Sequence, residues 1–210
     1  MASKDRIQRQ KEETRNSILD AAYAIVKEEG WEGLNMRKIA DRIEYTAPII
    51  YEYFANKQAI IEELTCKGHN NLTKLVKAAS ETETHPDKKL QAMWVAFWNF
   101  AFANKELYQV MFGVEMKCCV QSDNFERETT YQLFVKCIEE IMQDQQPTGA
   151  EVKIKYFTFF SVIHGLISVN MIGNGLSETT NEQIFKDAVV AITRSLYKQE
   201  EIPVKETTSS

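Results

Sequence analysis

The spacing of apolar residues constrains this chain most: they recur at intervals of three and four along nearly every long segment. That period places them on one face of an α-helix. No stretch combines the alternation of a half-buried strand with flanking hairpin turns. The sequence therefore predicts an all-α fold.

The composition argues against a disordered protein and against a membrane protein. The chain has 210 residues, 44% of them hydrophobic and 26% charged, as in an ordinary globular protein. This length favours one small module joined to a larger helical body. The net charge of −5 does not argue against nucleic acid, because only the charge on the face presented to phosphates matters. The first 17 residues carry five basic and three acidic side chains.

Neither export nor a membrane partner is expected. The polar N-terminus does not resemble a signal peptide. The most apolar long stretch, residues 156–172, contains His164 and follows Lys153 and Lys155, which favours a buried helix over a membrane span. The cysteines, Cys66, Cys118, Cys119 and Cys137, form neither a CxxC pair nor a zinc ligand set, and a redox role for the adjacent Cys118 and Cys119 is not favoured. We expect a cytoplasmic protein without metal or cofactor.

Three helices are expected near the N-terminus. The first covers about residues 6–29 and ends at Gly30. The second follows Asn35 as N-cap, and a tight turn at residues 44–46 leads to a third helix that Thr46 can cap and in which Pro48 occupies the first turn. This order is typical of a helix-turn-helix, whose third helix enters the major groove of DNA. A non-DNA-binding helix pair remains open on this pattern alone.

Further helices are separated by clear breaks. A long fourth helix begins after Asn56 and ends before the break at His85-Pro86. The following helices are expected at about residues 87–103, 106–112, 124–143, 150–172 and 181–197, with a frayed tail at 199–210.

Two runs make the helix-turn-helix interpretation specific. Residues 30–40 read GWEGLNMRKIA, and residues 45–57 read YTAPIIYEYFANK. Together they resemble the DNA-binding domain of the tetracycline-repressor (TetR) family over roughly residues 17–64, most specifically in the Tyr-x-Tyr-Phe-x-Asn-Lys segment. The resemblance implies a transcriptional regulator. The sequence contains no HExxH, GxSxG, P-loop or GxGxxG motif, so an enzyme is not expected.

The resemblance also implies DNA-contacting residues. Tyr51, Tyr53 and Lys57 correspond to groups that bind phosphate, and Thr46 to the hydroxyl residue that opens the third helix. Hydroxyl and ammonium groups donate to phosphate oxygens without reading sequence. Asn35 and Arg37 are further candidates, since they stand at the positive end of the second helix.

Base reading would fall to Ala47, Pro48, Ile49 and Glu52. The sequence departs here from the common family pattern, which often has glycine at the position of Glu44 and a polar or basic residue at that of Ala47. Chemistry predicts that Ala47 and Ile49 favour thymine methyl groups and that Glu52 accepts from cytosine N4. A simple solvated position is the alternative for Glu52.

The second half of the chain carries many large apolar residues, and the family typically encloses a small-molecule pocket there. The candidate ligand-binding residues are Trp94, Phe97, Trp98, Phe102, Tyr108, Met111, Phe112 and His164. An ordinary aromatic core is the alternative for the cluster, and a buried, hydrogen-bonded imidazole is the alternative for His164.

The domain organisation follows. We expect a helix-turn-helix DNA-binding domain at residues 1–56, a helical ligand-binding and dimerisation domain at 57–198, and a flexible tail at 199–210. The last two long helices would pair with those of a second copy, and the homodimer would bind a palindromic operator in double-stranded DNA as a repressor released by a small apolar or aromatic effector. The alternative is an apolar-ligand carrier or a protein-binding adaptor without sequence-specific DNA binding.

Overall fold

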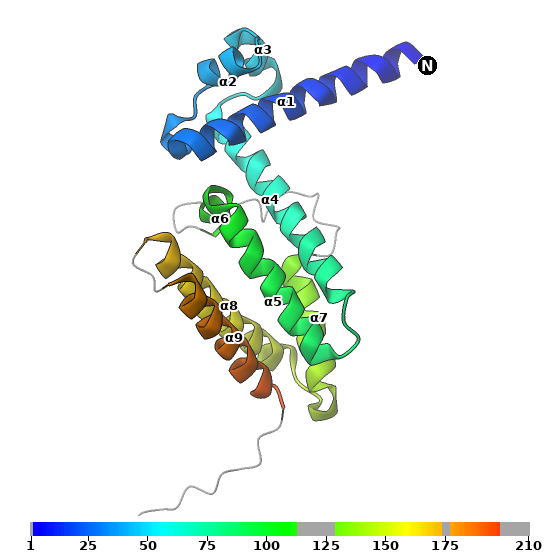
Figure 1. Cartoon of the computed structure of the whole chain (residues 1–210). Coiled ribbons are helices and arrows are strands. Elements are labelled where there is room, and N and C mark those ends of the chain that lie inside the picture. Colours follow the sequence, from blue (N-terminus) through cyan, green and yellow to red (C-terminus); the bar gives the residue numbers. More distant parts are fainter. Residues whose placement is uncertain (1, 113–128, 174–176, 198–210) are drawn as a thin grey trace, which may run out of the picture. The chain divides into compact units, whose positions relative to one another are not determined.

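The computed structural model describes residues 2–112, 129–173 and 177–197, and every regular element in these ranges is a helix. The chain forms two compact units. The first comprises residues 2–71 and 104–112, and the second comprises the remaining described residues. The helices are α1 (Ala2–Gly33), α2 (Met36–Arg42), α3 (Ala47–Tyr53), α4 (Lys57–Ser80), α5 (Pro86–Ala103), α6 (Lys105–Phe112), α7 (Thr130–Met142), α8 (Gly149–Met171) and α9 (Glu178–Arg194), with a short 3₁₀ helix η1 (Gln143–Gln145) after α7 (Figure 1).

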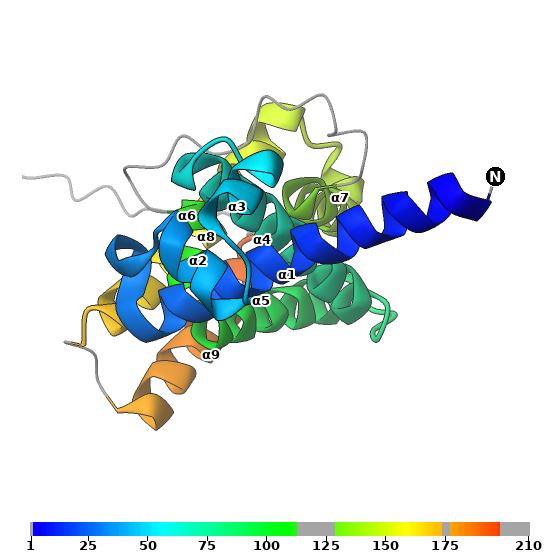
Figure 2. The same cartoon turned by 90° about the horizontal axis from the view of Figure 1, so that it is seen from above.

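The predicted apolar stripe of α1 forms the centre of the first unit. Ile18, Leu19 and Ala22 have no exposed surface, and Ile25 and Val26 have almost none. Other buried apolar residues of this unit lie on α2 to α4 and in the turns between them, including Ile39, Ala40, Ile50, Phe54, Ile60 and Leu64, and on α6, including Leu107 and Val110. The two short helices α2 and α3 are therefore held against the long helix α1, as the helix-turn-helix prediction requires (Figure 2).

The helix boundaries of this unit confirm most of the expected signals. Gly30 has a positive φ of 75°, although a further turn follows it before α1 ends. Asn35 caps α2 by accepting from the Lys38 amide, and Asn56 accepts from the Ala59 amide at the start of α4. Thr46 occupies the N-cap position of α3, but the expectation that its side chain caps this helix is wrong, because its hydroxyl makes no cap hydrogen bond.

Helix α6 belongs to the first unit, where it packs closely on α4. A β-carbon added to Gly68 would lie 2.6 Å from the Met111 sulfur and 2.9 Å from Leu107 Cγ. The Trp31 indole donates to the Glu106 carbonyl at 3.0 Å, and the Tyr23 hydroxyl donates to Asn104 at 3.2 Å. The predicted boundary after residue 56 stays a prediction, but α6 is grouped with the helix-turn-helix.

The second unit is built from α5, α7, α8 and α9 with the last turns of α4. Capping boxes start both α7 and α8, where Thr129 and Thr148 exchange hydrogen bonds with Gln132 and Glu151. The buried residues of α8, Val152, Tyr156, Phe159, Ile163 and Ile167, follow intervals of three and four. Helix α8 is long and apolar enough to cross a membrane, by length and composition only.

Candidate DNA-binding and effector sites

The ten residues predicted to contact DNA all lie in the first unit. On α3 the side chain of Ile50 is buried, whereas Pro48, Tyr51 and Glu52 are exposed on the opposite side of the helix. Tyr51 is 55% exposed, which is unusual for an aromatic side chain in a well-packed module. Ala47, Ile49 and Tyr53 are intermediate in exposure. The outward face of α3 can therefore meet a partner through Pro48, Tyr51 and Glu52.

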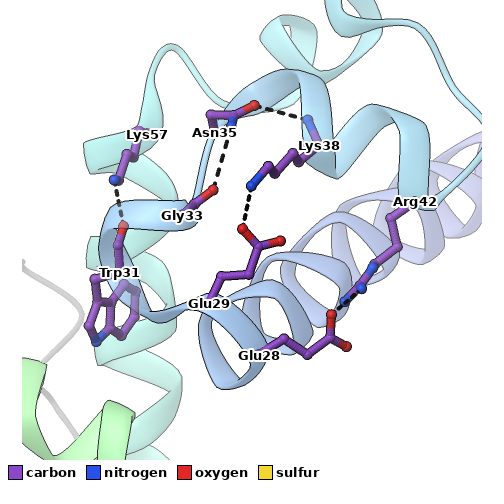
Figure 3. Close-up of polar contacts among 8 residues, drawn as sticks. All are labelled: Glu28, Glu29, Trp31, Gly33, Asn35, Lys38, Arg42 and Lys57. Atoms are coloured by element: carbon purple, nitrogen blue, oxygen red, sulfur yellow. Dashed lines mark hydrogen bonds and ion pairs between the residues drawn. The ribbon is translucent and has the colours of Figure 1, made fainter.

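The basic side chains of α2 differ in their availability (Figure 3). Lys38 pairs with Glu29 and Arg42 with Glu28, so both cations tie α2 to the end of α1. The hydrogen bond from Arg42 lowers the pKa of the Glu28 carboxyl. Arg37 is exposed, and no ion pair within the described residues engages its guanidinium. Arg37 is thus the cation of α2 that is available to a phosphate.

Lys57 has a structural contact that the sequence did not predict. Its ammonium donates to the Trp31 carbonyl at 2.6 Å, just beyond the break at Gly30 (Figure 3). A basic side chain at this point satisfies a carbonyl near the end of a helix, and its positive charge interacts favourably with the negative end of the helix dipole. Because the Trp31 indole also bonds to Glu106, the backbone and side chain of Trp31 together join α1 to α4 and to α6.

Arg15 positions the recognition helix and was missed as a functional residue. Its guanidinium pairs with Glu63 of α4 and donates to the Tyr53 carbonyl at 3.1 Å, at the end of α3. It also lies 4.3 Å above the centre of the Phe54 ring, a cation–π contact. The partners are 38 and 48 residues away in sequence, so no local spacing announces this role.

The predicted ligand-binding residues are divided between the two units. Trp94, Phe97, Trp98, Phe102 and His164 lie in the second unit, whereas Tyr108, Met111 and Phe112 lie on α6 in the first. Within the first unit, the rings of Phe112 and His69 meet edge to face with centres 5.6 Å apart. The structure therefore does not place all eight side chains in one unit.

Trp94 is the centre of the aromatic cluster in the second unit. Its ring stacks on Phe134 with centres 3.9 Å apart and on Phe159 at 5.6 Å, and it meets Phe97 edge-on at 5.5 Å. The indole nitrogen of this fully buried residue is the buried side-chain polar atom that lacks a hydrogen-bond partner in the described part of the chain. An unpaired buried donor is costly and calls for an explanation.

His164 joins the edge of this cluster. Its ring stacks on Phe160 with centres 5.3 Å apart and almost parallel planes. Partial burial lowers the pKa of the imidazole, so the neutral form is favoured. The aromatic partners on α7 and α8, including Phe134 and Phe159, were not predicted as site residues, although the helical period of their own segments marks them as inward-facing.

Some sequence-based expectations lie outside the described residues. These are the adjacent pair Cys118 and Cys119, the start of the helix expected at 124–143, and the tail at 199–210.

Comparison with known proteins decides the family. The profile described as "Bacterial regulatory proteins, tetR family" matches residues 18–64, and that described as "Tetracyclin repressor-like, C-terminal domain" matches residues 90–192. The chain belongs to the TetR family. This family consists of transcriptional regulators and not enzymes, and the protein is accordingly a TetR-family transcriptional regulator with a helix-turn-helix DNA-binding domain.

Curated relatives of this TetR-family regulator are similar over part of its length. The HTH-type transcriptional activator FasR of Mycolicibacterium smegmatis is 28% identical over 102 residues, which are 49% of this chain and 47% of FasR. The regulator YobS of Bacillus subtilis is 32% identical over 98 residues, 46% of this chain and 50% of YobS. The class A tetracycline repressor from Escherichia coli is 37% identical over 49 residues, 23% of each chain. The chain thus spans about half the length of the first two relatives and less of the third.

Solved structures share the fold of the regulator. A TetR/AcrR-family regulator from Thermobifida fusca covers 89% of this chain and all of its own, with a TM-score of 0.62 at 15% identity. The fatty acid degradation regulator FadR from Bacillus halodurans covers 88% of this chain and 97% of its own, with the same TM-score and identity. At these identities the likeness shows the fold.

Proposed function

We propose that this regulator is a cytoplasmic homodimeric repressor that binds a palindromic operator and is released by a small apolar or aromatic effector. The observation that carries the proposal is the polar surface on α2 and α3, where Arg37, Tyr51 and Glu52 are exposed while their neighbours hold the two helices in place. The names of the relatives include both an activator and a repressor, and repression is the mode we propose.

Two kinds of DNA contact are proposed for this surface. Asn35, Arg37, Thr46, Tyr51 and Tyr53 would position the protein on phosphates, and Lys57 would contribute charge at the start of α4. Ala47, Pro48, Ile49 and Glu52 would face the base edges, with the apolar residues on thymine methyl groups and Glu52 on cytosine N4. Each good base contact is worth about 1–3 kcal/mol of discrimination.

The apolar face of α8 supports the homodimer. Ile154 is 64% exposed and Val169 is 52% exposed, and Phe157 and Val162 are also on the surface of this helix. Several exposed apolar side chains on one helix favour an interaction site there. A second copy of the same face would cover them, and dimer symmetry would present two recognition helices about 34 Å apart to two half-sites.

The buried indole of Trp94 supports effector binding in the second unit. Its unpaired N–H would donate to an acceptor on the effector, while the surrounding rings would contact the apolar body. One structural neighbour, FadR, is named as a regulator of fatty acid degradation, which is compatible with an apolar effector class. To invert a 99:1 population of DNA-binding and released states, the effector must bind the released state about 10⁴-fold more tightly.

The phosphate contacts can be tested before the operator is known, because such contacts do not depend on sequence. Fluorescence anisotropy would follow binding to a mixed-sequence duplex between about 50 and 200 mM salt. Arg37→Ala should reduce the slope of log K against log salt by about 0.9 per subunit. Lys38→Ala is the matched control, since its charge is already paired with Glu29. Equal slopes for the two variants would remove Arg37 from the proposed site.

The dimer has its own test. Phe157→Glu places a charge on the exposed face of α8 and should convert the dimer to a monomer in sedimentation velocity. Lys153→Glu on the same helix is the control, because this side chain is already charged and exposed. A monomeric wild-type protein at micromolar concentration would contradict the proposed homodimer.

A further inference from the structure

The N-terminal part of α1 projects from the three-helix module. Every side chain from Lys4 to Glu13 is exposed, whereas the buried stripe of α1 begins at Ile18. In both views the first turns of α1 project away from the module and extend past α2 and α3 (Figures 1 and 2). At about 1.5 Å per residue, residues 4–13 form a helical arm roughly 15 Å long. We define residues 4–13 as the arm.

The arm remains helical without a core to pack against. Residues 4–13 contain neither glycine nor proline, and most of them favour helix. The Gln8 amide donates to the Glu12 carboxylate at 3.0 Å, one turn further on. The structure thus continues α1 as a helix beyond the module, and every side chain from residue 4 to residue 13 is exposed.

The charge of the arm differs in sign from that of the protein. Its first eight residues carry four cations, Lys4, Arg6, Arg9 and Lys11, and one carboxylate, Asp5, a net charge of +3. Glu12 and Glu13 at its inner end reduce the net charge of the whole arm to +1, in a chain of net charge −5. None of these four cations forms an ion pair with the described residues. An acidic protein that approaches DNA is repelled overall, so locally basic segments determine where it makes contact.

The arm is also fixed in direction relative to the recognition helix. Arg15, at the point where the arm joins the module, donates to the Tyr53 carbonyl at the end of α3 and pairs with Glu63. Because α1 is continuous from the arm through Arg15, these contacts set the direction in which the arm leaves the module. Double-stranded DNA carries one negative charge per about 1.7 Å of helix axis, so a helix about 15 Å long that runs along a duplex would pass several phosphates.

We propose that the arm is a second DNA-contacting element, in which Lys4, Arg6, Arg9 and Lys11 bind the phosphate backbone of duplex DNA next to the half-site held by α3. This inference rests on the proposed function, because it requires the first unit to bind DNA. It adds a contact outside the helix-turn-helix, and the contact is independent of base sequence.

The test compares two charge-matched variants by the salt dependence of binding to one mixed-sequence duplex. The arm variant carries Lys4→Gln, Arg6→Gln, Arg9→Gln and Lys11→Gln, which preserve helix propensity. The control variant carries Lys74→Gln, Lys88→Gln, Lys136→Gln and Lys153→Gln, all on the helices of the second unit. Both variants change the net charge equally, and far-UV circular dichroism confirms that each is folded.

The expected results separate the arm from a general charge effect. If each arm of a dimer makes only one phosphate contact, the arm variant loses about 1.8 from the slope of log K against log salt, and the control variant keeps the wild-type slope. A lysine variant, Arg6→Lys with Arg9→Lys, should retain the slope because charge suffices for phosphate contact. Equal slopes for the arm and control variants, while the wild type binds DNA, overturn the arm and leave the proposed function intact. Failure of the wild type to bind any duplex overturns both.

Discussion

The two units of this protein both have apolar cores but differ in the further contacts that hold their helices. In the first unit, polar contacts fix the short helices: Arg15 holds the end of α3, and Lys57 holds the carbonyl of Trp31. In the second unit, aromatic rings on α5, α7 and α8 stack around Trp94. Hydrogen bonds and ion pairs require a particular orientation of the two groups, whereas apolar packing mainly requires side chains of suitable total volume.

This difference fits the demands on each unit. A recognition helix must present the same side chains at the same angle each time, and directional contacts at its ends provide that. A set of stacked rings tolerates repacking at similar volume, which suits a unit that responds to an apolar molecule. Substitutions in each unit test whether the contrast holds.

The largest effect is expected at the centre of the aromatic cluster. Trp94→Ala should destabilise the protein by about 3–5 kcal/mol, because it removes the ring on which Phe134 and Phe159 stack. Trp94→Phe should cost much less, since it keeps a ring and removes an indole N–H that has no partner among the described residues. Urea unfolding measures the free energy of unfolding of both variants. If Trp94→Phe lost as much stability as Trp94→Ala, the indole N–H would have to be satisfied in solution.

A somewhat smaller effect is expected where α6 meets α4. Gly68→Ala places a methyl group within 3 Å of Met111 and Leu107 and should cost about 1–3 kcal/mol by overpacking. Met111→Ala in the same chain removes the nearest obstructing atom, so the double variant should lose less than the sum of the two single variants. Additive losses in the thermodynamic cycle would mean that α6 does not pack on Gly68.

A gain in stability is expected in the turn between α2 and α3. Glu44 adopts a positive φ of 58°, a conformation that side chains with a β-carbon disfavour. Glu44→Gly should relieve this strain and stabilise the protein by up to about 1 kcal/mol. Asp41→Gly inside α2 is the control and should destabilise by a similar amount. Thermal unfolding distinguishes the two directions, and destabilisation by Glu44→Gly would indicate that the Glu44 side chain makes a compensating contact.

The smallest effect is expected on the pH dependence of stability. Burial lowers the pKa of His69 below its ordinary value, so the unfolded chain takes up a proton more readily than the folded one as pH falls below about 6.5. Stability should therefore decrease between about pH 7 and 5.5, and His69→Gln should reduce that decrease. His164→Gln should reduce it less, because burial lowers the pKa of His164 as well but this side chain is less enclosed. Melting temperatures of the three proteins at each pH test this order.

The sequence predicted the elements of the fold well because its signals are local. Asn35 and Asn56 as caps, Gly30 at a break and Pro48 in the first turn of α3 each act within a few residues. The candidate site was predicted less completely. The contacts of Arg15 with Tyr53 and Glu63 and of Lys57 with Trp31 join residues 26 to 48 positions apart, which helical periodicity does not reveal.

The predicted ligand-binding residues are divided between the two units for the same reason, because contacts between residues far apart in sequence decide where α6 lies. Tyr108, Met111 and Phe112 follow α5 directly in sequence, yet α6 is grouped with the helix-turn-helix. Its position depends on the small size of Gly68 and on the hydrogen bond from Trp31 to Glu106. Neither feature is visible in the apolar pattern of α6 itself.

Sequence-specific binding by the first unit depends above all on the exposed face of α3. Selection from a pool of random duplexes, followed by sequencing, measures this directly for the wild type, for Tyr51→Ala and for Glu52→Ala. We expect that the wild type enriches a palindrome, that Tyr51→Ala loses enrichment, and that Glu52→Ala changes the preferred base within each half-site. Absence of any enriched sequence for the wild type at low salt would contradict DNA reading by α3.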